Sequence, residues 1–140
     1  MSTDLDWGMI QRAFGFDEAE MEHLKNSPKQ LRVLRAARRL VRTRIVAEVV
    51  SAKGCEAHKV GDKYVYTGTG RLLPQESCHW LCSWAIAPVV PFIFMVYDRI
   101  SSGLDPKDMV FDHVKCLDTG LKCGGFGETY PKVTVMEPQK

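Results

Sequence analysis

Along the first third of the chain, apolar residues recur at the spacing of amphipathic helices, with polar residues between them. One helix is predicted over residues 3–14 and ends at Gly15. A short second helix follows a capping box within residues 17–25. A third is predicted over residues 28–43, with Pro28 at its first position.

After residue 43 the pattern changes to the partial alternation and β-branched residues of strands. Strands are predicted over residues 44–50 and 63–67, joined as a hairpin with a long loop. Two more are predicted over residues 109–116 and 130–136. The glycine-rich stretch 120–127 between them is interpreted as a flexible hairpin turn, and the alternative is that its backbone N–H groups hold an anion.

Between these strand pairs lies the most apolar stretch of the chain, Leu81 to Tyr97. A helix is predicted to open at Cys78 with Ser77 as its cap, to break at Pro88 and to restart at Pro91. Apolar residues occupy nearly all faces of this predicted helix, which predicts that it is buried on most sides. The prolines and the absence of basic anchors argue against a membrane span.

These elements predict an α+β fold: a small, mostly antiparallel sheet packed on a proline-broken apolar helix. A length of 140 residues suits one domain, and 45% apolar residues can supply its core. We expect residues 1–43 to form an N-terminal helical extension and residues 44–140 to form the core domain with the cysteine and histidine clusters.

Basic residues are concentrated in the third predicted helix. Lys29 and six arginines fall between residues 28 and 44 with no acid among them, although the net charge is only +2. The stretch from Arg32 to Arg44 is interpreted either as the partner of an acidic helix in the same chain or as a docking face for an acidic protein. Nucleic-acid binding is not expected, because the rest of the chain is net acidic and has no aromatic platform.

The chain has five cysteines, an odd number, and its first residues are acidic and lack an apolar run. No export signal is therefore expected, and a cytoplasmic location is predicted. In a reducing compartment thiols serve metals or redox chemistry more often than structural disulfides.

A metal site is the first candidate for chemistry. Cys55 and His58 have the Cys-x-x-His spacing at which one loop offers sulfur and nitrogen to the same ion. Cys82 and Cys116 complete a set of four ligands from a loop, a helix start and a strand end, which suits zinc or iron. The alternative is that these cysteines are ordinary small apolar residues of the core.

Three further residues are candidates for catalysis. Cys78 is expected in the first turn of a helix, where the helix dipole stabilises a thiolate. His113 has acidic neighbours and is a candidate base, and Cys123 beside the glycines is a spare ligand or a free thiol. Cys78 and Cys82, four residues apart, could instead share a face as a redox pair, and all of these thiols could equally be inert.

The stretch Cys55-x-x-His58-Lys-Val-Gly-Asp62, followed by Leu-Cys82 and by Cys116-x-Asp118, resembles a family of small uncharacterised bacterial and archaeal proteins with that pattern. The resemblance covers about residues 44–136. It implies that Cys55, His58, Cys82 and Cys116 belong together, whereas Cys78 and Cys123 lie outside the pattern. It implies no particular activity.

These observations lead to two hypotheses for function, and the sequence does not decide whether the protein is an enzyme. The first is a small metal- or thiol-centred accessory protein, which docks on a larger enzyme or self-associates as an oligomer through Leu81–Tyr97 and Arg32–Arg44. The alternative is a small metal- or cysteine-dependent enzyme acting on a small carbonyl or aromatic substrate. The number of protein ligands would distinguish them, since four close a structural site and three leave a position open.

Overall fold

The computed structural model describes residues 4–138. Its internal contacts divide the chain into two compact units, with the division between Arg38 and Arg39. The division falls inside helix α3 (Pro28–Arg42), somewhat before the boundary at residue 43 expected from the pattern. Each unit is described separately.

The N-terminal unit consists of α1 (Trp7–Phe14), α2 (Glu18–Lys25) and the first part of α3. Asp6 caps α1 by accepting from the Met9 N–H at 2.8 Å, and Gly15 ends it in the left-handed region. The predicted capping box at the start of α2 is present. The apolar faces meet in a small core formed by Ile10, Met21 and Leu24, with Leu5, Trp7, Phe16 and Leu34 packed against them.

The second unit is built on a three-stranded antiparallel sheet with the order β2-β1-β3. The strands are β1 (Arg44–Lys53), β2 (Lys63–Thr67) and β3 (Glu128–Met136), so three predicted strands are confirmed. A register shift between Val49 and Ser51 lets β1 continue three residues past the predicted end while keeping its pairing with β3.

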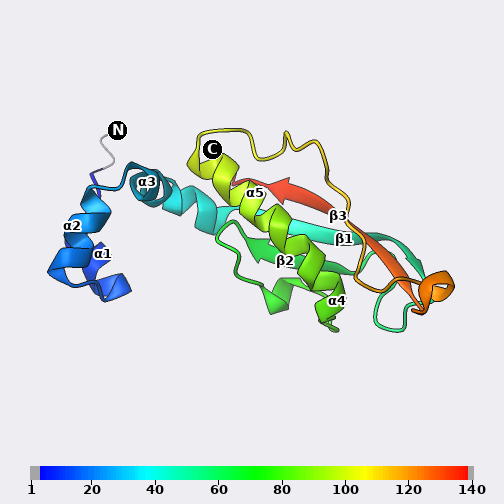
Figure 1. Ribbon diagram of the computed structural model, residues 1–140. Helices are drawn as coiled ribbons and strands as arrows, with labels where there is room; N and C mark the ends of the chain where they lie inside the picture. The colour runs from blue at the N-terminus through cyan, green and yellow to red at the C-terminus, as the bar shows by residue number, and fades with distance from the viewer. Residues whose placement is uncertain (1–3, 139–140) are drawn as a thin grey trace. The chain divides into compact units, whose positions relative to one another are not determined.

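One face of this sheet carries the apolar core, and a layer of helices lies over the sheet (Figure 1). Ile45, Ala47 and Val49 of β1 are fully buried, and their neighbours on that face of β2 and β3 are buried as well. The helical layer consists of α4 (Ser83–Ile86), the 3₁₀ turn η2 (Ala87–Val89) and α5 (Val90–Ser101). It contributes Ala85, Val89, Ile93, Val96 and Ile100 to the buried core. The α+β fold with a proline-broken apolar helix on an antiparallel sheet is thus confirmed.

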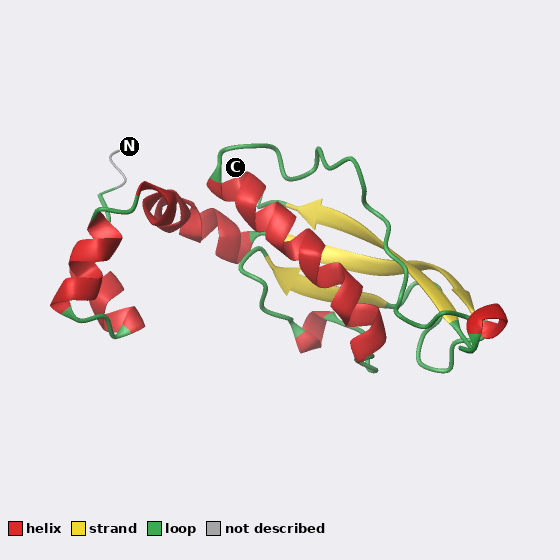
Figure 2. Cartoon of the chain, viewed as in Figure 1, coloured by secondary structure: helices red, strands yellow, loops and turns green. Residues whose placement is uncertain are grey.

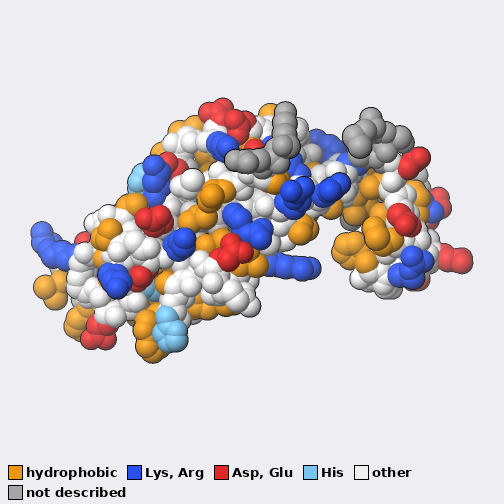
Figure 3. Space-filling view, turned by 180° about the vertical axis from the view of Figure 1, so that it is seen from behind, with side chains coloured by type: hydrophobic (Ala, Val, Ile, Leu, Met, Phe, Trp, Pro, Cys, Tyr) orange, Lys and Arg blue, Asp and Glu red, His pale blue; other side chains and the backbone are white. Residues whose placement is uncertain are grey.

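The opposite face of the sheet is mixed, because polar side chains lie there beside Val46 and the buried Val65. Its exposed positions include Glu48, Lys63, Lys132 and Thr134, and charged side chains of both signs are spread over the molecule in the view from behind (Figure 3). Within the second unit, α4, η2 and α5 form the helical layer over the apolar face of the sheet.

The segment from Ser83 to Ser101 is long and apolar enough to cross a membrane by length and composition, and 28% of it is buried. Core helices of soluble proteins meet the same criterion. In this structure its inward residues Val89, Ile93 and Val96 belong to the core over the sheet.

Two sequence predictions are wrong at this level. The apolar helix does not open at Cys78: Ser77 instead accepts from the Val65 N–H at 3.0 Å and donates to the Leu73 carbonyl at 2.8 Å, and the helix starts only at Ser83. The stretch 109–116 is not a strand either. It lies within the long connection between α5 and β3 (Figure 2) and forms a single isolated bridge, between His113 and Lys132.

Candidate functional site

One cavity of about 460 Å³ in the second unit is lined by all four predicted metal ligands. Cys55 and His58 belong to the loop after β1, Cys82 precedes α4, and Cys116 lies in the connection that leads to β3. The remaining wall is formed by Gly54, Glu56, Ala57, Trp84, Ala85, Asp118, Phe126, Gly127 and Thr129. Segments far apart in the sequence therefore meet at one site.

Two glycines allow the loop that holds Cys55 to approach the glycine-rich loop before β3. Gly54 has φ +64°, and a Cβ there would lie 2.9 Å from the Phe126 carbonyl oxygen. A Cβ on Gly127 would lie 3.0 Å from both the Cys55 Cα and the Gly54 carbonyl oxygen. Because these are backbone atoms, neither position has room for a side chain, and the cavity wall depends on both glycines.

A chain of buried polar contacts connects His58 to Cys82 through Tyr64 of β2. The Tyr64 hydroxyl accepts from the Cys82 N–H at 3.2 Å and is hydrogen-bonded to His58 Nε2. The Cys82 N–H can only donate, so His58 Nε2 is the neighbour to which the Tyr64 hydroxyl can give its proton. Tyr64 is fully buried, and burial raises its pKa above the ordinary value, so the hydroxyl stays a donor.

The other ring nitrogen of His58 faces Asp62. His58 Nδ1 lies 3.6 Å from Asp62 Oδ2, beyond hydrogen-bond distance, and has no hydrogen-bond partner within residues 4–138. Asp62 itself accepts from the Lys59 N–H at 3.0 Å, which closes the His-Lys-Val-Gly-Asp turn. His58 is therefore engaged by Tyr64 through Nε2, whereas its buried Nδ1, which faces Asp62, is without a hydrogen-bond partner among the described residues.

Cys116 is held against β3 by backbone contacts in both directions. Its N–H donates to the Thr129 carbonyl at 3.0 Å, and the Thr129 N–H points to Cys116 Sγ at 3.4 Å. An N–H directed at sulfur is typical of the surroundings of thiolate ligands. Thr129 is 1% exposed, and its Oγ1 has no partner among the described residues. A buried hydroxyl without a partner in a cavity wall is a feature that a bound group would satisfy.

Asp118, the acid of the Cys-x-Asp pair, organises the glycine-rich loop. Its carboxylate accepts from the N–H groups of Gly120 at 2.9 Å, Phe126 at 3.0 Å and Gly127 at 3.1 Å. These N–H groups, with that of Gly120 first, hold the pKa of Asp118 below its ordinary value. The anion cradle was the alternative interpretation of this loop beside a flexible turn, and three of the loop's N–H groups bind this internal carboxylate.

The side chains of the cavity do not form a finished coordination shell. Among residues 4–138, no three His, Cys, Asp or Glu side chains lie close enough together to hold a metal ion as they stand. All five cysteines are free thiols. The donor set nonetheless fits a thiophilic ion, since three thiols and an imidazole line one cavity whose wall also contains two polar atoms without partners.

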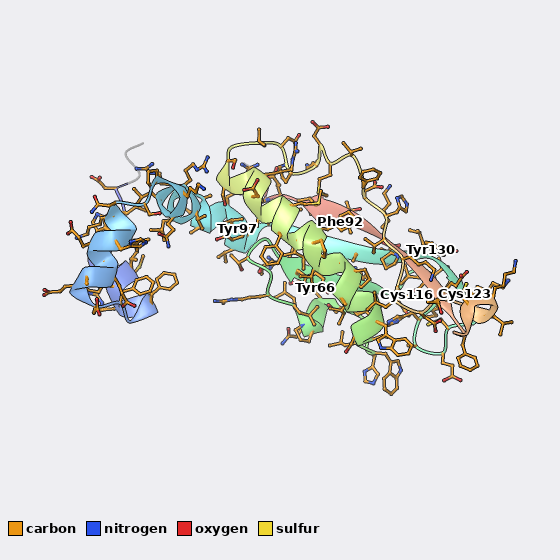
Figure 4. The ribbon with its side chains drawn as sticks, viewed as in Figure 1. Tyr66, Phe92, Tyr97, Cys116, Cys123 and Tyr130 are labelled. Carbon is orange, nitrogen blue, oxygen red and sulfur yellow. The ribbon has the colours of Figure 1, made fainter. Side chains whose placement is uncertain are left out.

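The three residues predicted as catalytic candidates lie outside this cavity wall. Cys78 is not in a helix, and burial together with the charge of Asp62 raises its thiol pKa, the opposite of the predicted activation. His113 is exposed and pairs with Asp112 at 2.5 Å. Cys123 is exposed on the 3₁₀ turn η3 (Leu121–Cys123), at the same end of the sheet as Cys116 (Figure 4).

Sequence reasoning missed several residues that shape the site. Tyr64 was assigned only as a strand residue, and Thr129 falls just before the predicted strand 130–136. The aromatic side chains at the cavity, Trp84 and Phe126, were given no functional role. Both aromatics are largely exposed, at 60% and 80%, so the cavity has an apolar rim. The only available signal was position: Trp84 follows Cys82 by two residues, and Phe126 lies between the glycines.

Comparison with known proteins adds no assignment: no protein-family model, no curated protein and no solved structure matches this chain.

Proposed function

We propose that this protein is a thiol-centred metal-binding protein in which Cys55, Cys82 and Cys116 bind one zinc or iron ion. The observation that carries the proposal is the division of the cysteines. These three come from separate segments and line one cavity, whereas Cys78 and Cys123 lie elsewhere. If the thiols were only partly buried small residues, there would be no reason for the three cysteines of the sequence pattern to share one cavity.

The chemistry of the donors supports a soft or borderline ion. Three thiolates suit zinc and iron. Hard cations that prefer oxygen ligands, such as magnesium, are disfavoured because the Asp118 carboxylate already accepts hydrogen bonds from loop N–H groups. Binding requires the sulfurs to converge by rotation between staggered side-chain conformations. The bound ion would tie the β1 loop, the start of α4 and the edge of β3 together, so its binding energy would add to stability.

The role that we propose for the metal-bound domain is that of an accessory subunit. Apolar side chains remain exposed at the cavity rim and along the helical layer, among them Trp84, Phe94 and Phe126. Apolar surface next to a buried centre is typical of a docking face on a larger enzyme or on a second copy of the chain.

The test is a cobalt titration of protein purified without oxygen, because thiolate-to-cobalt charge-transfer absorption reports sulfur ligation directly. Serine variants of Cys55, Cys82 and Cys116 are each expected to weaken binding at least about tenfold. Serine variants of Cys78 and Cys123 are matched controls and are expected to bind like the wild type. Equal effects at all five positions, or no charge-transfer band in the wild type, would contradict the proposal.

A small enzyme is the second candidate function, and the size of the cavity favours it. A volume of about 460 Å³ exceeds what one ion needs and falls in the range of small-molecule sites. If three thiolates hold the ion, the fourth position is open to water or substrate. An added small ligand such as azide would change the cobalt spectrum of an open site and leave a closed, four-ligand site unchanged.

A further inference from the structure

A second cavity, of about 410 Å³, lies between β2 and α5 and shares no lining residue with the thiol-lined one. Its wall is mostly apolar, with Ile86, Val90, Ile93 and Phe94 from the helical layer. Tyr66 on β2 and Tyr97 on α5 complete it together with the turn at Thr69 and Gly70 (Figure 4). Phe94 is 68% exposed and Val90 is partly exposed, so the cavity can be reached from solvent.

The polar groups of this wall are not equivalent. The Thr69 hydroxyl is engaged, because it pairs with the Thr67 hydroxyl at 2.7 Å. The Tyr66 hydroxyl is buried on a residue only 3% exposed, and it has no hydrogen-bond partner within residues 4–138. Buried hydroxyls are almost always hydrogen-bonded, so this one, on a residue that lines the cavity, is available to donate to a molecule bound there.

The chemistry of this hydroxyl limits what the acceptor can be. Burial, reinforced by the neighbouring Cys78, raises the pKa of Tyr66 to about 12. The phenol therefore remains protonated and serves as a donor at physiological pH. Its complement is a carbonyl or ether oxygen on an otherwise apolar molecule, because most of the remaining wall offers apolar contacts.

We propose that the cavity between β2 and α5 binds a small apolar molecule carrying one carbonyl oxygen, which accepts a hydrogen bond from the Tyr66 hydroxyl. The volume supports this occupant, since it lies within the range of small-molecule sites. Gly70 lines the cavity without a side chain: a Cβ there would contact Ile93 Cγ2 at 3.4 Å, and a larger side chain would take up space in the cavity.

The experiment uses two probes of similar shape, acetophenone and cumene, which differ in having and lacking a carbonyl. Binding to the full chain is followed by NMR through the Gly70 amide and the Ile93 methyl signals. Tyr66→Phe is expected to weaken acetophenone binding about tenfold, the effect of losing one buried neutral hydrogen bond, and to leave cumene binding within about twofold. Tyr130→Phe, on β3, is the matched control and is expected to change neither.

Val90→Trp provides an independent test, because a partly exposed helix position tolerates the larger side chain while the entrance is narrowed. It is expected to reduce the binding of both probes. Failure of both probes to shift the Gly70 and Ile93 signals would overturn the proposal. So would unchanged acetophenone binding in Tyr66→Phe. Neither result depends on a metal, so this test and the cobalt titration can fail separately.

Discussion

Tyr64 and Tyr66 offer a direct test of how the core around the thiol-lined cavity is held together. The two side chains lie on the same face of β2, opposite Ala47 and Ile45, and both are buried. They differ in their hydroxyls: that of Tyr64 contacts His58 and Cys82, and that of Tyr66 has no partner in the described part of the chain. Replacing each by phenylalanine removes the same atom from two different environments.

The expected magnitudes follow from these contacts. Tyr64→Phe leaves two polar groups without their partner, the nearly fully buried His58 Nε2 and the half-buried Cys82 N–H. At about 1–3 kcal/mol for each buried polar group left unsatisfied, with Cys82 at the lower end, the free energy of unfolding should fall by about 2–4 kcal/mol. Tyr66→Phe leaves no other polar group of the described residues without a hydrogen bond, so it should change the free energy of unfolding by less than about 1 kcal/mol or increase it.

Urea unfolding followed by circular dichroism measures both values, and the slope m shows whether the transition itself is unchanged. Tyr130→Phe on the exposed side of β3 serves as the control and should match the wild type. Equal losses for Tyr64→Phe and Tyr66→Phe would refute the reasoning, since burial alone would then determine the cost. A stable Tyr64→Phe variant would show that His58 and Cys82 do not depend on this hydroxyl.

Three further predictions concern the loops and thiols. The pKa of Asp118 is lowered in the folded protein, so its carboxylate contributes fully to stability above the ordinary carboxyl pKa, and this contribution is lost as the pH falls through the folded-state pKa. Loop amide signals should therefore shift below about pH 4 in the wild type but not in Asp118→Asn. Gly127→Ala should lower the free energy of unfolding by about 1–3 kcal/mol in urea, because its Cβ meets the Cys55 backbone, and wild-type stability would show that the loops can separate freely. Cys78 should be alkylated by iodoacetamide more slowly than Cys123 at neutral pH, since its raised pKa keeps it a thiol; faster labelling of Cys78, read by mass spectrometry, would contradict this.

The sequence predicted the elements whose signals are local. The stretch 63–67 was recognised as a strand from its β-branched and aromatic residues alone, and the capping box before α2 formed as its spacing indicated. The apolar stretch with Pro88 and Pro91 was recognised as a broken helix, because proline acts on its own backbone and needs no distant partner.

The predictions that failed depended on distant contacts. Ser77 has the right chemistry for a cap, but its hydroxyl is used by Val65 and Leu73, so the helix opens later. The stretch 109–116 has the composition of a strand, yet it meets the edge of β3 only through separate hydrogen bonds such as Val114 N–H to the Pro131 carbonyl at 2.9 Å. Neither outcome is visible in a local sequence pattern, because each depends on contacts with another part of the chain.

For the candidate site, the sequence selected which cysteines share a cavity but not how they are held. The contact between Tyr64 and His58 joins two residues whose spacing carries no recognisable signal. The approach of Gly54 to Gly127 becomes visible only when the two loops are placed together. This approach arises from the pairing of β1 with β3, which a single sequence does not specify.

The most direct test of the account is X-ray absorption spectroscopy of the zinc-loaded protein, which counts the sulfur atoms bound to the metal. We expect three sulfurs per zinc in the wild type and the same three in the double variant Cys78→Ser and Cys123→Ser. Fewer than three sulfurs in the wild type, or the loss of one in the double variant, would show that Cys55, Cys82 and Cys116 do not form the metal centre.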